Sequence, residues 1–417
     1  MNQKRYQLLS VWFVLLPFIL SCLAIQDLST PEEEPTPTYD FEFDPFSEGN
    51  TAEPLPEISF DVASIPTYSG LIGGGGLVVC PYGSRYQANN AITFMNPDGS
   101  GNPTIVWRQD TESYYRYPIF SPDKKQLIFT KSVYGTELFE LFIMRTGDSI
   151  PLQITHELDN GAYTVEPTLG EGSSQWSPNG KYIAYTALGG PRGDKTVVIT
   201  PDGQNRWEYY VKSTNDEPNY GEYVKSTKFA GWSPDSTQIL IYDYIDYDSS
   251  RESSNIYVVD ITTQNVRELT DKQDSQRDKL ALWSPDGSKI LFVRDSHNDP
   301  TVNGIYTINP DGSNEQRILG PDGVDKVNGH PSWLPDSSRI IFISDSKDNN
   351  HLYVMNSDGS NLIRISQGNG GYKGFVLSPD GKYYAGGATA DGTTIYSIDG
   401  SKSWIVPDCW GIEDWLP

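Results

Sequence analysis

The residues best suited to chemistry are basic side chains that recur at one offset from a repeated apolar anchor. The anchors are Phe120, Trp176, Trp232, Trp283, Trp333, Leu377 and Trp415. Four residues before them stand Arg116, Gly172, Lys228, Lys279, Gly329, Lys373 and Gly411. Four of these positions are basic and none is acidic, although the chain has a net charge of −24. Converging cations attract anions. Arg116, Lys228, Lys279 and Lys373 therefore predict an anion-binding site, and the alternative is that each pairs with an acid of its own loop.

Further contact residues are expected in the longer connections around these positions. The stretch from Tyr242 to Asp248 alternates Tyr and Asp, and Tyr is common in binding surfaces. We therefore expect Tyr244 and Tyr247 to take part in binding, with solvated loop residues as the alternative. His330 follows Gly329, and it is the one histidine of the sequence that lies beside the expected start of a strand A.

The anchors belong to a repeated hairpin, clearest from Leu282 to Val293. Trp283 ends a first strand, Ser-Pro-Asp-Gly forms a tight turn, and a β-branched run follows as a second strand. The first six anchors are 56, 56, 51, 50 and 44 residues apart. The turn glycine is replaced by Lys124, Ser236 and Ser337 in three copies. If those residues keep a positive φ, each costs about 1 kcal/mol.

A second hairpin follows the first in each repeat, as in Gly304 to Leu319 with its turn at Asp311-Gly312. Two hairpins give four antiparallel strands, A to D, which form one propeller blade. Short turns then lie on one face. The long, unequal connections lie on the other, where a rigid scaffold usually carries functional residues.

The repeated text resembles the TolB-type β-propeller repeat. The resemblance rests on Ser-Pro-Asp-Gly hairpins such as 284–287 and on Leu352-Tyr-Val-Met-Asn356-Ser-Asp-Gly359, and it spans nearly all of residues 90–417. It implies an all-β propeller with a binding role in the bacterial envelope. TolB proper also carries a separate N-terminal α/β domain, in whose place we expect a disordered stalk in this chain.

The two ends of the chain supply the parts of one more blade. The sequences expected for strands B, C and D occur at Leu77 to Cys80, Ala91 to Gly99 and Pro103 to Trp107. The final residues 413–417 have a sequence similar to that of 331–335, and we expect them to form strand A. We therefore predict a seven-bladed propeller closed by the C-terminal strand. Cys80 and Cys409 then fall on adjacent strands, which predicts a disulfide in an exported protein, with two buried thiols as the alternative.

The N-terminus has the pattern of an export signal. Lys4 and Arg5 precede an apolar run that ends Ile19-Leu20-Ser21-Cys22. This resembles the lipobox of bacterial lipoproteins, which implies a signal peptide at 1–21 and lipidation of Cys22. An ordinary secretory signal is the alternative. Residues 23–70 contain eleven acids, seven prolines and no Lys or Arg. We therefore expect a disordered stalk at 22–70 and the propeller at 71–417.

Composition and motifs narrow the function. The negative charge argues against nucleic acid as a partner. Propeller-bearing serine peptidases add a hydrolase domain with Gly-x-Ser-x-Gly, which is absent here, and the four histidines predict no metal cluster. The Asp-rich loops could bind Ca²⁺, but none has EF-hand spacing, so we expect no cofactor. The sequence thus predicts a monomeric, non-enzymatic, lipid-anchored propeller that binds a protein, peptide or glycan and faces the periplasm or the cell exterior. The alternative is a metal-dependent propeller similar to polysaccharide lyases.

Overall fold

The computed structural model describes a set of residue ranges from position 77 onward. These are 77–82, 91–98, 104–108, 115–132, 138–145, 148, 150–157, 164–165, 174–189, 193–209, 211–212, 224–244, 254–270, 276–296, 298–320, 326–327, 331–346, 349–366, 374–389, 392–407, 409, 412 and 414–416. The chain separates into two compact units, Met1–Leu55 and Pro56–Pro417, and every described residue lies in the second. The expected signal peptide, Cys22 and stalk lie outside the described residues. Within the described ranges, no helix has the length and apolarity needed to cross a bilayer.

Six sheets are built from consecutive stretches of chain, and each is called a blade here. Blade 1 contains β4 (Tyr115–Phe120), β5 (Gln126–Ser132), β6 (Phe139–Arg145) and β7 (Leu152–Gln153). Blade 2 contains β8 (Thr164–Val165), β9 (Gln175–Trp176), β10 (Ile183–Leu188), β11 (Lys195–Ile199) and β12 (Arg206–Tyr209). Blade 3 contains β13 (Val211–Lys212), β14 (Val224–Trp232), β15 (Gln238–Tyr244), β16 (Ile256–Asp260) and β17 (Val266–Glu268).

The remaining blades follow the same plan. Blade 4 contains β18 (Gln276–Trp283), β19 (Ile290–Ser296), the short 3-10 helix η3 (Pro300–Val302), β20 (Gly304–Ile308) and β21 (Gln316–Leu319). Blade 5 contains β22 (Lys326–Val327), β23 (Ser332–Trp333), β24 (Arg339–Ser346), β25 (Asn349–Asn356) and β26 (Ile363–Arg364). Blade 6 contains β27 (Val376–Leu377), β28 (Tyr383–Thr389), β29 (Gly392–Ser397) and β30 (Ser403–Pro407).

A seventh sheet, the terminal sheet, joins the two ends of the described chain. Its order is β3 (Thr104–Arg108), β2 (Ala91–Met95), β1 (Leu77–Tyr82) and β31 (Asp414–Leu416). Leu77 pairs with Leu416 and Val79 with Asp414. The predicted all-β architecture of antiparallel blades is confirmed, with four or five strands in each sheet. Six blades are each formed by a continuous stretch of sequence, and the terminal sheet combines strands from both ends of the described chain.

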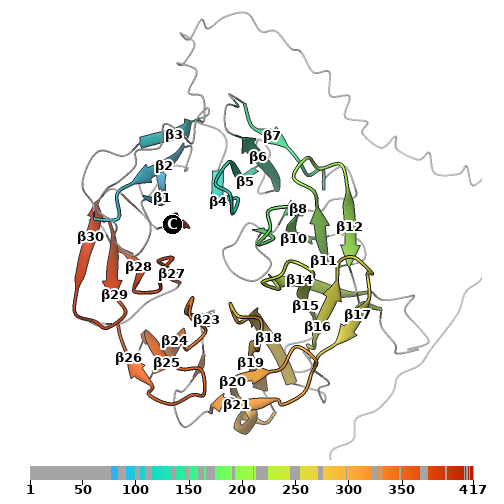
Figure 1. Cartoon of the computed structure of the whole chain (residues 1–417), viewed down its shortest axis with the longest axis vertical. Helices are drawn as coiled ribbons and strands as arrows, with labels where there is room; N and C mark the ends of the chain where they lie inside the picture. Colours follow the sequence, from blue (N-terminus) through green and yellow to red (C-terminus); the bar gives the residue numbers. More distant parts are fainter. Residues whose placement is uncertain are drawn as a thin grey trace, which may run out of the picture. The chain divides into compact units, whose positions relative to one another are not determined.

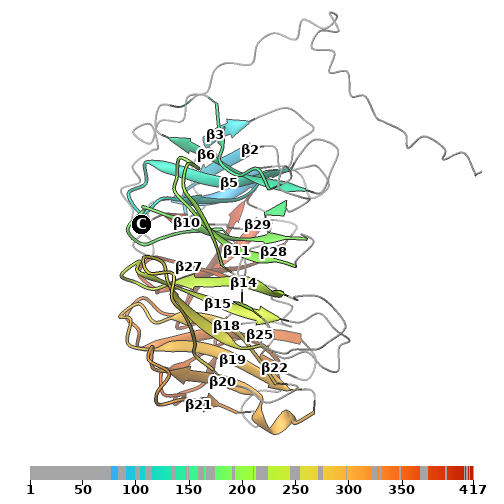
Figure 2. The ribbon, with the colours of Figure 1, turned by 90° about the vertical axis from the view of Figure 1, so that its right-hand side faces the viewer.

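The sheets succeed one another around a common axis, with strand A innermost and strand D outermost (Figure 1). In the side view the strands of successive blades run between two sides of the propeller (Figure 2). We call these the turn side, which holds the A–B and C–D turns, and the loop side, where strand A begins and strand B ends.

The A–B turns owe their shape to a buried serine. Ser284 Oγ donates to Asp286 Oδ1 at 2.6 Å and accepts from the Lys289 N–H at 2.9 Å. The equivalent bonds recur at Ser121, Ser177, Ser233 and Ser378. One hydroxyl therefore satisfies both the acidic turn residue and the returning strand, which explains why Ser-Pro-Asp recurs.

The three turns without glycine keep the left-handed backbone. The φ angles of Lys124, Ser236 and Ser337 are 60°, 63° and 59°. The two serines gain a bond in return, because each hydroxyl accepts an N–H from the turn of the preceding blade. Ser236 Oγ lies 3.0 Å from the nitrogen of Asn179, and Ser337 Oγ lies 3.1 Å from that of Asp286.

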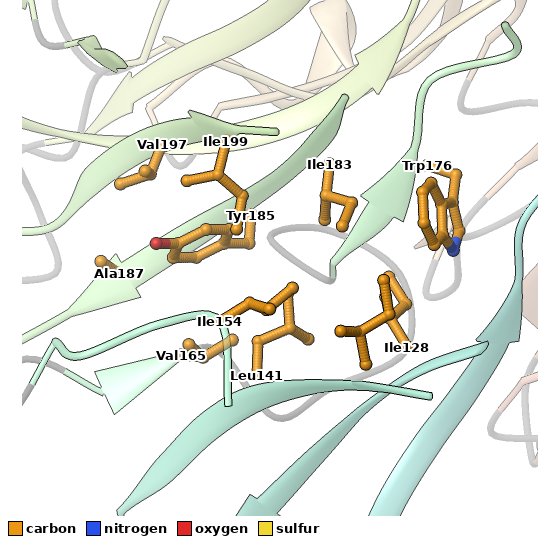
Figure 3. Close-up of a cluster of buried hydrophobic side chains, with 11 residues drawn as sticks. Ile128, Leu141, Ile154, Val165, Trp176, Ile183, Tyr185, Ala187, Val197 and Ile199 are labelled. Carbon is orange, nitrogen blue, oxygen red and sulfur yellow. The ribbon is translucent and has the colours of Figure 1, made fainter. Parts of the chain in front are cut away.

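The core is divided into layers between neighbouring blades. Figure 3 shows the layer between blades 1 and 2, where Ile128 and Leu141 of blade 1 face Ile183 and Tyr185 of blade 2. Trp176 closes one end of this layer, and its Nε1 donates to the Ile119 carbonyl at 3.2 Å. Trp232 and Trp333 make the same bond to the preceding blade. These three tryptophan anchors therefore lie between neighbouring blades.

The C-terminal segment packs on blade 6 before it reaches the terminal sheet. Cys409, Ile412 and Trp415 are buried in one cluster with side chains of blade 6. Cys409 is disulfide-bonded and precedes β31 rather than lying on it. Cys80 is in β1, and its pairing with Cys409 stays a prediction.

Candidate functional site

Three of the four expected basic residues occupy equivalent places on inner strands. Arg116 pairs with Thr130, Lys228 with Tyr242 and Lys279 with Val293. In each blade the register between strands A and B shifts just after the basic residue or its neighbour. These positions lie toward the loop side, since strand A begins there. The fourth residue, Lys373, lies outside the described residues.

Two of these irregularities put bulky residues into a left-handed backbone. Tyr117, after Arg116, has a φ of 54°, and Leu280, after Lys279, has a φ of 57°. Such conformations cost about 1–2 kcal/mol each in a residue with a Cβ. Strained residues of this kind concentrate at functional sites. The strain therefore singles out the loop-side half of β4 and β18.

Blades 2 and 5 build their inner strand differently. Each inner strand is divided into two short pieces, β8 and β9 in blade 2 and β22 and β23 in blade 5. The expected positions Gly172 and Gly329 fall between the pieces, outside the described residues. The inner wall thus consists of continuous bulged strands in blades 1, 3 and 4 and interrupted strands in blades 2 and 5.

Lys279 is not a free cation. Its Nζ lies 2.6 Å from Asp295 Oδ2, and Arg277 Nε lies 2.6 Å from Asp295 Oδ1. Lys279 therefore pairs with a nearby acid, which was the alternative to a free anion-binding cation. Arg277 and Lys279 share this one carboxylate.

The inner strands carry more basic residues than the anchor offset reveals. Together with β13, which pairs with β14, they contain seven: Arg116, Lys212, Lys225, Lys228, Arg277, Lys279 and Lys326. The same strands contain two acids, Asp278 and Asp414. In a chain with 55 acidic and 31 basic residues, this is a local reversal of charge. We call these seven residues the basic wall.

Asp278 does not neutralise the basic wall, because it is engaged from the other face of β18. Arg294 Nε and Nη2 donate to its two oxygens at 2.7 and 3.0 Å, and Nη1 and Nη2 reach Glu315 at 2.7 and 3.0 Å. The guanidinium also lies 4.3 Å from the ring centroid of Tyr306. Burial by itself would lower the pKa of Arg294, but the bonds to Glu315 and Asp278 outweigh it and raise the pKa. This arginine is a structural clamp.

A second buried ionic network joins blades 1 and 2. Tyr185 Oη donates to Glu157 Oε1 at 2.5 Å, and Arg206 bonds both groups and Glu208. Burial and the neighbouring Glu157 carboxylate raise the pKa of Tyr185 well above its usual value. Every polar atom named here has a partner, so the network holds two blades together and offers no open site.

The expected rim residues fall at the edge of what the structure describes. Tyr244 is the last residue of β15 and pairs with Ser226, while Tyr247 and His330 lie outside the described residues. A tyrosine that sequence reasoning missed, Tyr257, donates to Asp243 Oδ2 at 3.1 Å beneath this rim. Burial and the Asp243 charge raise the pKa of Tyr257, so it serves as a neutral donor.

The two described histidines do not converge. His156 is exposed and lies 3.3 Å from Gln153 Nε2, whereas His351 is buried beside Ser366 Oγ at 3.1 Å. Burial, and then the Arg364 charge, lower the pKa of His351. Among the described residues, no three His, Cys, Asp or Glu side chains gather as a metal site would require.

The arrangement and the repeats agree with one known family. Residues 222–403 match the family model of the TolB β-propeller domain. This part of the chain is similar to the TolB-type β-propeller, and the match covers less than half of the chain. The recognition made from the hairpin text is thereby confirmed.

Relatives with this propeller include enzymes. A probable dipeptidyl-aminopeptidase B from Ajellomyces capsulatus is 26% identical over 221 residues, which cover 47% of this chain and 23% of that protein. The match thus spans less than a quarter of the relative's length. An oligogalacturonate lyase in complex with manganese superposes with a TM-score of 0.51 at 13% identity, over 80% of this chain and 84% of that one. A prolyl endopeptidase gives 0.51 at 12%, over 79% and 49%.

These relatives correct one expectation from the sequence. The absence of a hydrolase motif led us to expect a non-enzymatic protein. That expectation is wrong, because proteins similar to this propeller are named as peptidases and as a lyase. At these identities the structural likenesses show the fold, and no activity passes to this chain from them.

Proposed function

We propose that this chain is an exported, membrane-anchored TolB-like propeller that binds a carboxylate-bearing polymer, an acidic peptide or glycan, at its loop side. The observation that carries the proposal is the basic wall, seven basic residues against two acids on the inner strands of an acidic chain. Cations gathered at a concave mouth focus the field on an anionic ligand.

The proposal includes a closed ring of seven blades, with the terminal sheet as the seventh. Its support is the pairing of β31 with β1 and a second contact near the outer edge. There Trp404 of β30 donates from Nε1 to the Pro97 carbonyl, which follows β2, at 2.5 Å. Closure removes the exposed strand edge that an open ring would leave. A disulfide between Cys80 and Cys409 would fasten the same junction.

Within the mouth, Arg116, Lys228, Lys279 and Lys373 would contact the ligand's acidic groups, with Tyr244, Tyr247 and His330 at the rim. Charge-assisted bonds contribute about 1.5–3 kcal/mol each before losses to solvent. A polymer that reaches several cations gains further from multivalency. Specific binding can therefore arise from individually modest contacts.

Anchoring rests on the lipobox-like Ile19-Leu20-Ser21-Cys22, and an extracytoplasmic location agrees with the TolB-like propeller. One or two acyl chains hold a soluble domain at a membrane without a spanning helix. The Cys22→Ser protein should leave the membrane fraction, and a Ser21→Ala control should stay in it. Membrane retention of the Cys22→Ser protein would contradict the anchor.

A propeller lyase is the second candidate, favoured by the likeness to oligogalacturonate lyase over 80% of this chain. It predicts unsaturated uronate ends, read as ultraviolet absorbance, when the protein is incubated with oligogalacturonate and Mn²⁺. Absorbance that depends on Mn²⁺ would establish this candidate. The same incubation without metal is the control for absorbance that does not depend on Mn²⁺.

The binding proposal is tested with ligand pairs that differ only in charge. Oligogalacturonate and its methyl ester form one pair, and oligoglutamate and oligoglutamine form another. The proposal predicts binding of the acidic member of at least one pair, weakened by salt, and little binding of the neutral members. Equal binding of acidic and neutral members, or none, would contradict it.

A further inference from the structure

An acidic residue of the neighbouring strand β19, Asp295, contacts two residues of the basic wall. Arg277 and Lys279 are two residues apart on β18, so their side chains emerge on the same face of the sheet. Asp295, on the neighbouring strand β19 opposite Arg277, bridges them with two contacts of 2.6 Å. The three side chains are 38%, 30% and 20% exposed for Arg277, Lys279 and Asp295. The triad is therefore open to solvent and within reach of a ligand.

The triad contrasts with the ion pair on the opposite face of the same two strands. There Arg294 is almost fully buried and meets two carboxylates, Asp278 and Glu315. On the exposed face the ratio is reversed, because two cations meet one carboxylate. The Arg294–Asp278 pair is closed to solvent, whereas the triad of Arg277, Lys279 and Asp295 is partly exposed.

Asp295 is ionised at neutral pH. Partial burial opposes its charge, but Lys279 and Arg277 more than offset that effect and lower its pKa. A carboxylate therefore already lies between the two cations, in the position that a ligand carboxylate would take.

We propose that Asp295 is an internal competitor that sets the selectivity of the basic wall. A ligand carboxylate that enters the triad must displace Asp295 from Lys279 or Arg277, or share them with it. This exchange replaces one ion pair by another, so a single acidic group gains little at this point. A ligand with several closely spaced carboxylates can keep other contacts with the basic wall while one of its groups displaces Asp295. The triad thus favours polyacidic polymers over small anions, an inference that rests on the proposed binding function.

Asp295→Asn tests the competitor role directly. It should tighten binding of oligogalacturonate, measured by calorimetry at low salt, by about fivefold, the upper range for an exposed ion pair. It should also allow galacturonate monomer to bind. Asp299→Asn is the matched control. It removes the same charge from the same blade, and Asn can still accept the Thr301 bonds that Asp299 accepts. The control should change affinity by less than about twofold.

The effect must also depend on the two cations. In an Arg277→Gln/Lys279→Gln background, Asp295→Asn should change the affinity no more than the control does. The proposal is overturned if Asp295→Asn leaves binding unchanged, weakens it, or acts equally in the background variant.

The outcomes separate this inference from the proposed function. Wild-type binding with no gain in Asp295→Asn would retain the function and reject the competitor. Binding by Asp295→Asn alone would support the competitor and show that the wild-type mouth is closed to acids. Binding by neither protein would reject both.

Discussion

The hydroxyl of Ser236 accepts a hydrogen bond from the backbone N–H of Asn179, at 3.0 Å, across the boundary between blades 2 and 3. Ser236 holds a φ of 63°, which glycine would adopt without strain. The bond therefore offsets the strain of a side chain in the left-handed region. Ser337 and Asp286 repeat the relationship between blades 4 and 5.

This relationship predicts opposite results for two substitutions of Ser236. Ser236→Ala loses the bond and keeps the strain, so it should destabilise the fold by about 1 kcal/mol. Ser236→Gly loses the bond but relieves about 1 kcal/mol of strain, so it should be nearly neutral. Urea unfolding measures both. A glycine variant less stable than the alanine variant would contradict the explanation.

The tryptophan anchors predict unequal costs for the same change. Trp176→Phe removes the bond from Nε1 to the Ile119 carbonyl, whereas Nε1 of Trp283 has no partner among the described residues. Trp176→Phe should therefore cost about 1 kcal/mol more than Trp283→Phe. Trp283→Ala should cost about 3–5 kcal/mol because it leaves a cavity. Equal thermal shifts for the two phenylalanine variants would refute the role of the bond.

The Arg294 clamp predicts that removing the arginine lowers stability strongly and that a second substitution restores much of it. Arg294→Met leaves Asp278 buried without a counter-charge, which should cost about 3–5 kcal/mol. Adding Asp278→Leu should recover much of that loss. Lys382→Met is the surface control, since Lys382 is 75% exposed and 3.4 Å from Asp380, and it should change stability by at most about 1 kcal/mol. A small effect of Arg294→Met would show that the clamp is dispensable.

Asp399 predicts acid sensitivity on the turn side. Bonds from Ser401, Ser397 and the Ser401 backbone lower the pKa of Asp399 to about 2 from its ordinary value of 3.8. Because the folded pKa is the lower one, the stabilisation is complete above about pH 4 and is lost as pH falls toward 2. Carboxyl NMR should show this midpoint, and Ser401→Ala should move it upward. A wild-type midpoint near 3.8 would refute the bond network.

Much of the fold could be predicted because its rules are local. Ser-Pro-Asp turns and alternating strands repeat in the text, and each repeat becomes a blade through bonds such as Ser284 to Asp286. Lys124 fills the turn position that glycine fills in other repeats, and its positive φ follows from that shared turn. Tyr117 and Leu280 were not, because their φ angles follow from bulges in strand pairing, which a single repeat does not display.

The site was only partly predictable for the same reason. A fixed offset from the anchors found Arg116, Lys228 and Lys279 but missed Arg277 and Lys326, which join the basic wall through strand pairing and interrupted inner strands. The partner of Lys279 was also invisible, because Asp295 reaches it from the next strand. Side-chain pairing across strands depends on register, and the bulges change that register.

The most direct test of the basic wall is the salt dependence of oligogalacturonate binding in a Lys228→Ala/Lys279→Ala protein. The account predicts that affinity at low salt falls by about tenfold or more and that its salt dependence flattens, while the unfolding temperature barely changes. Lys181→Ala/Lys382→Ala removes the same charge from the turn side and should bind as the wild type does. Equal losses in both double variants, or no loss in either, would contradict the claim that the loop-side mouth binds the acidic ligand.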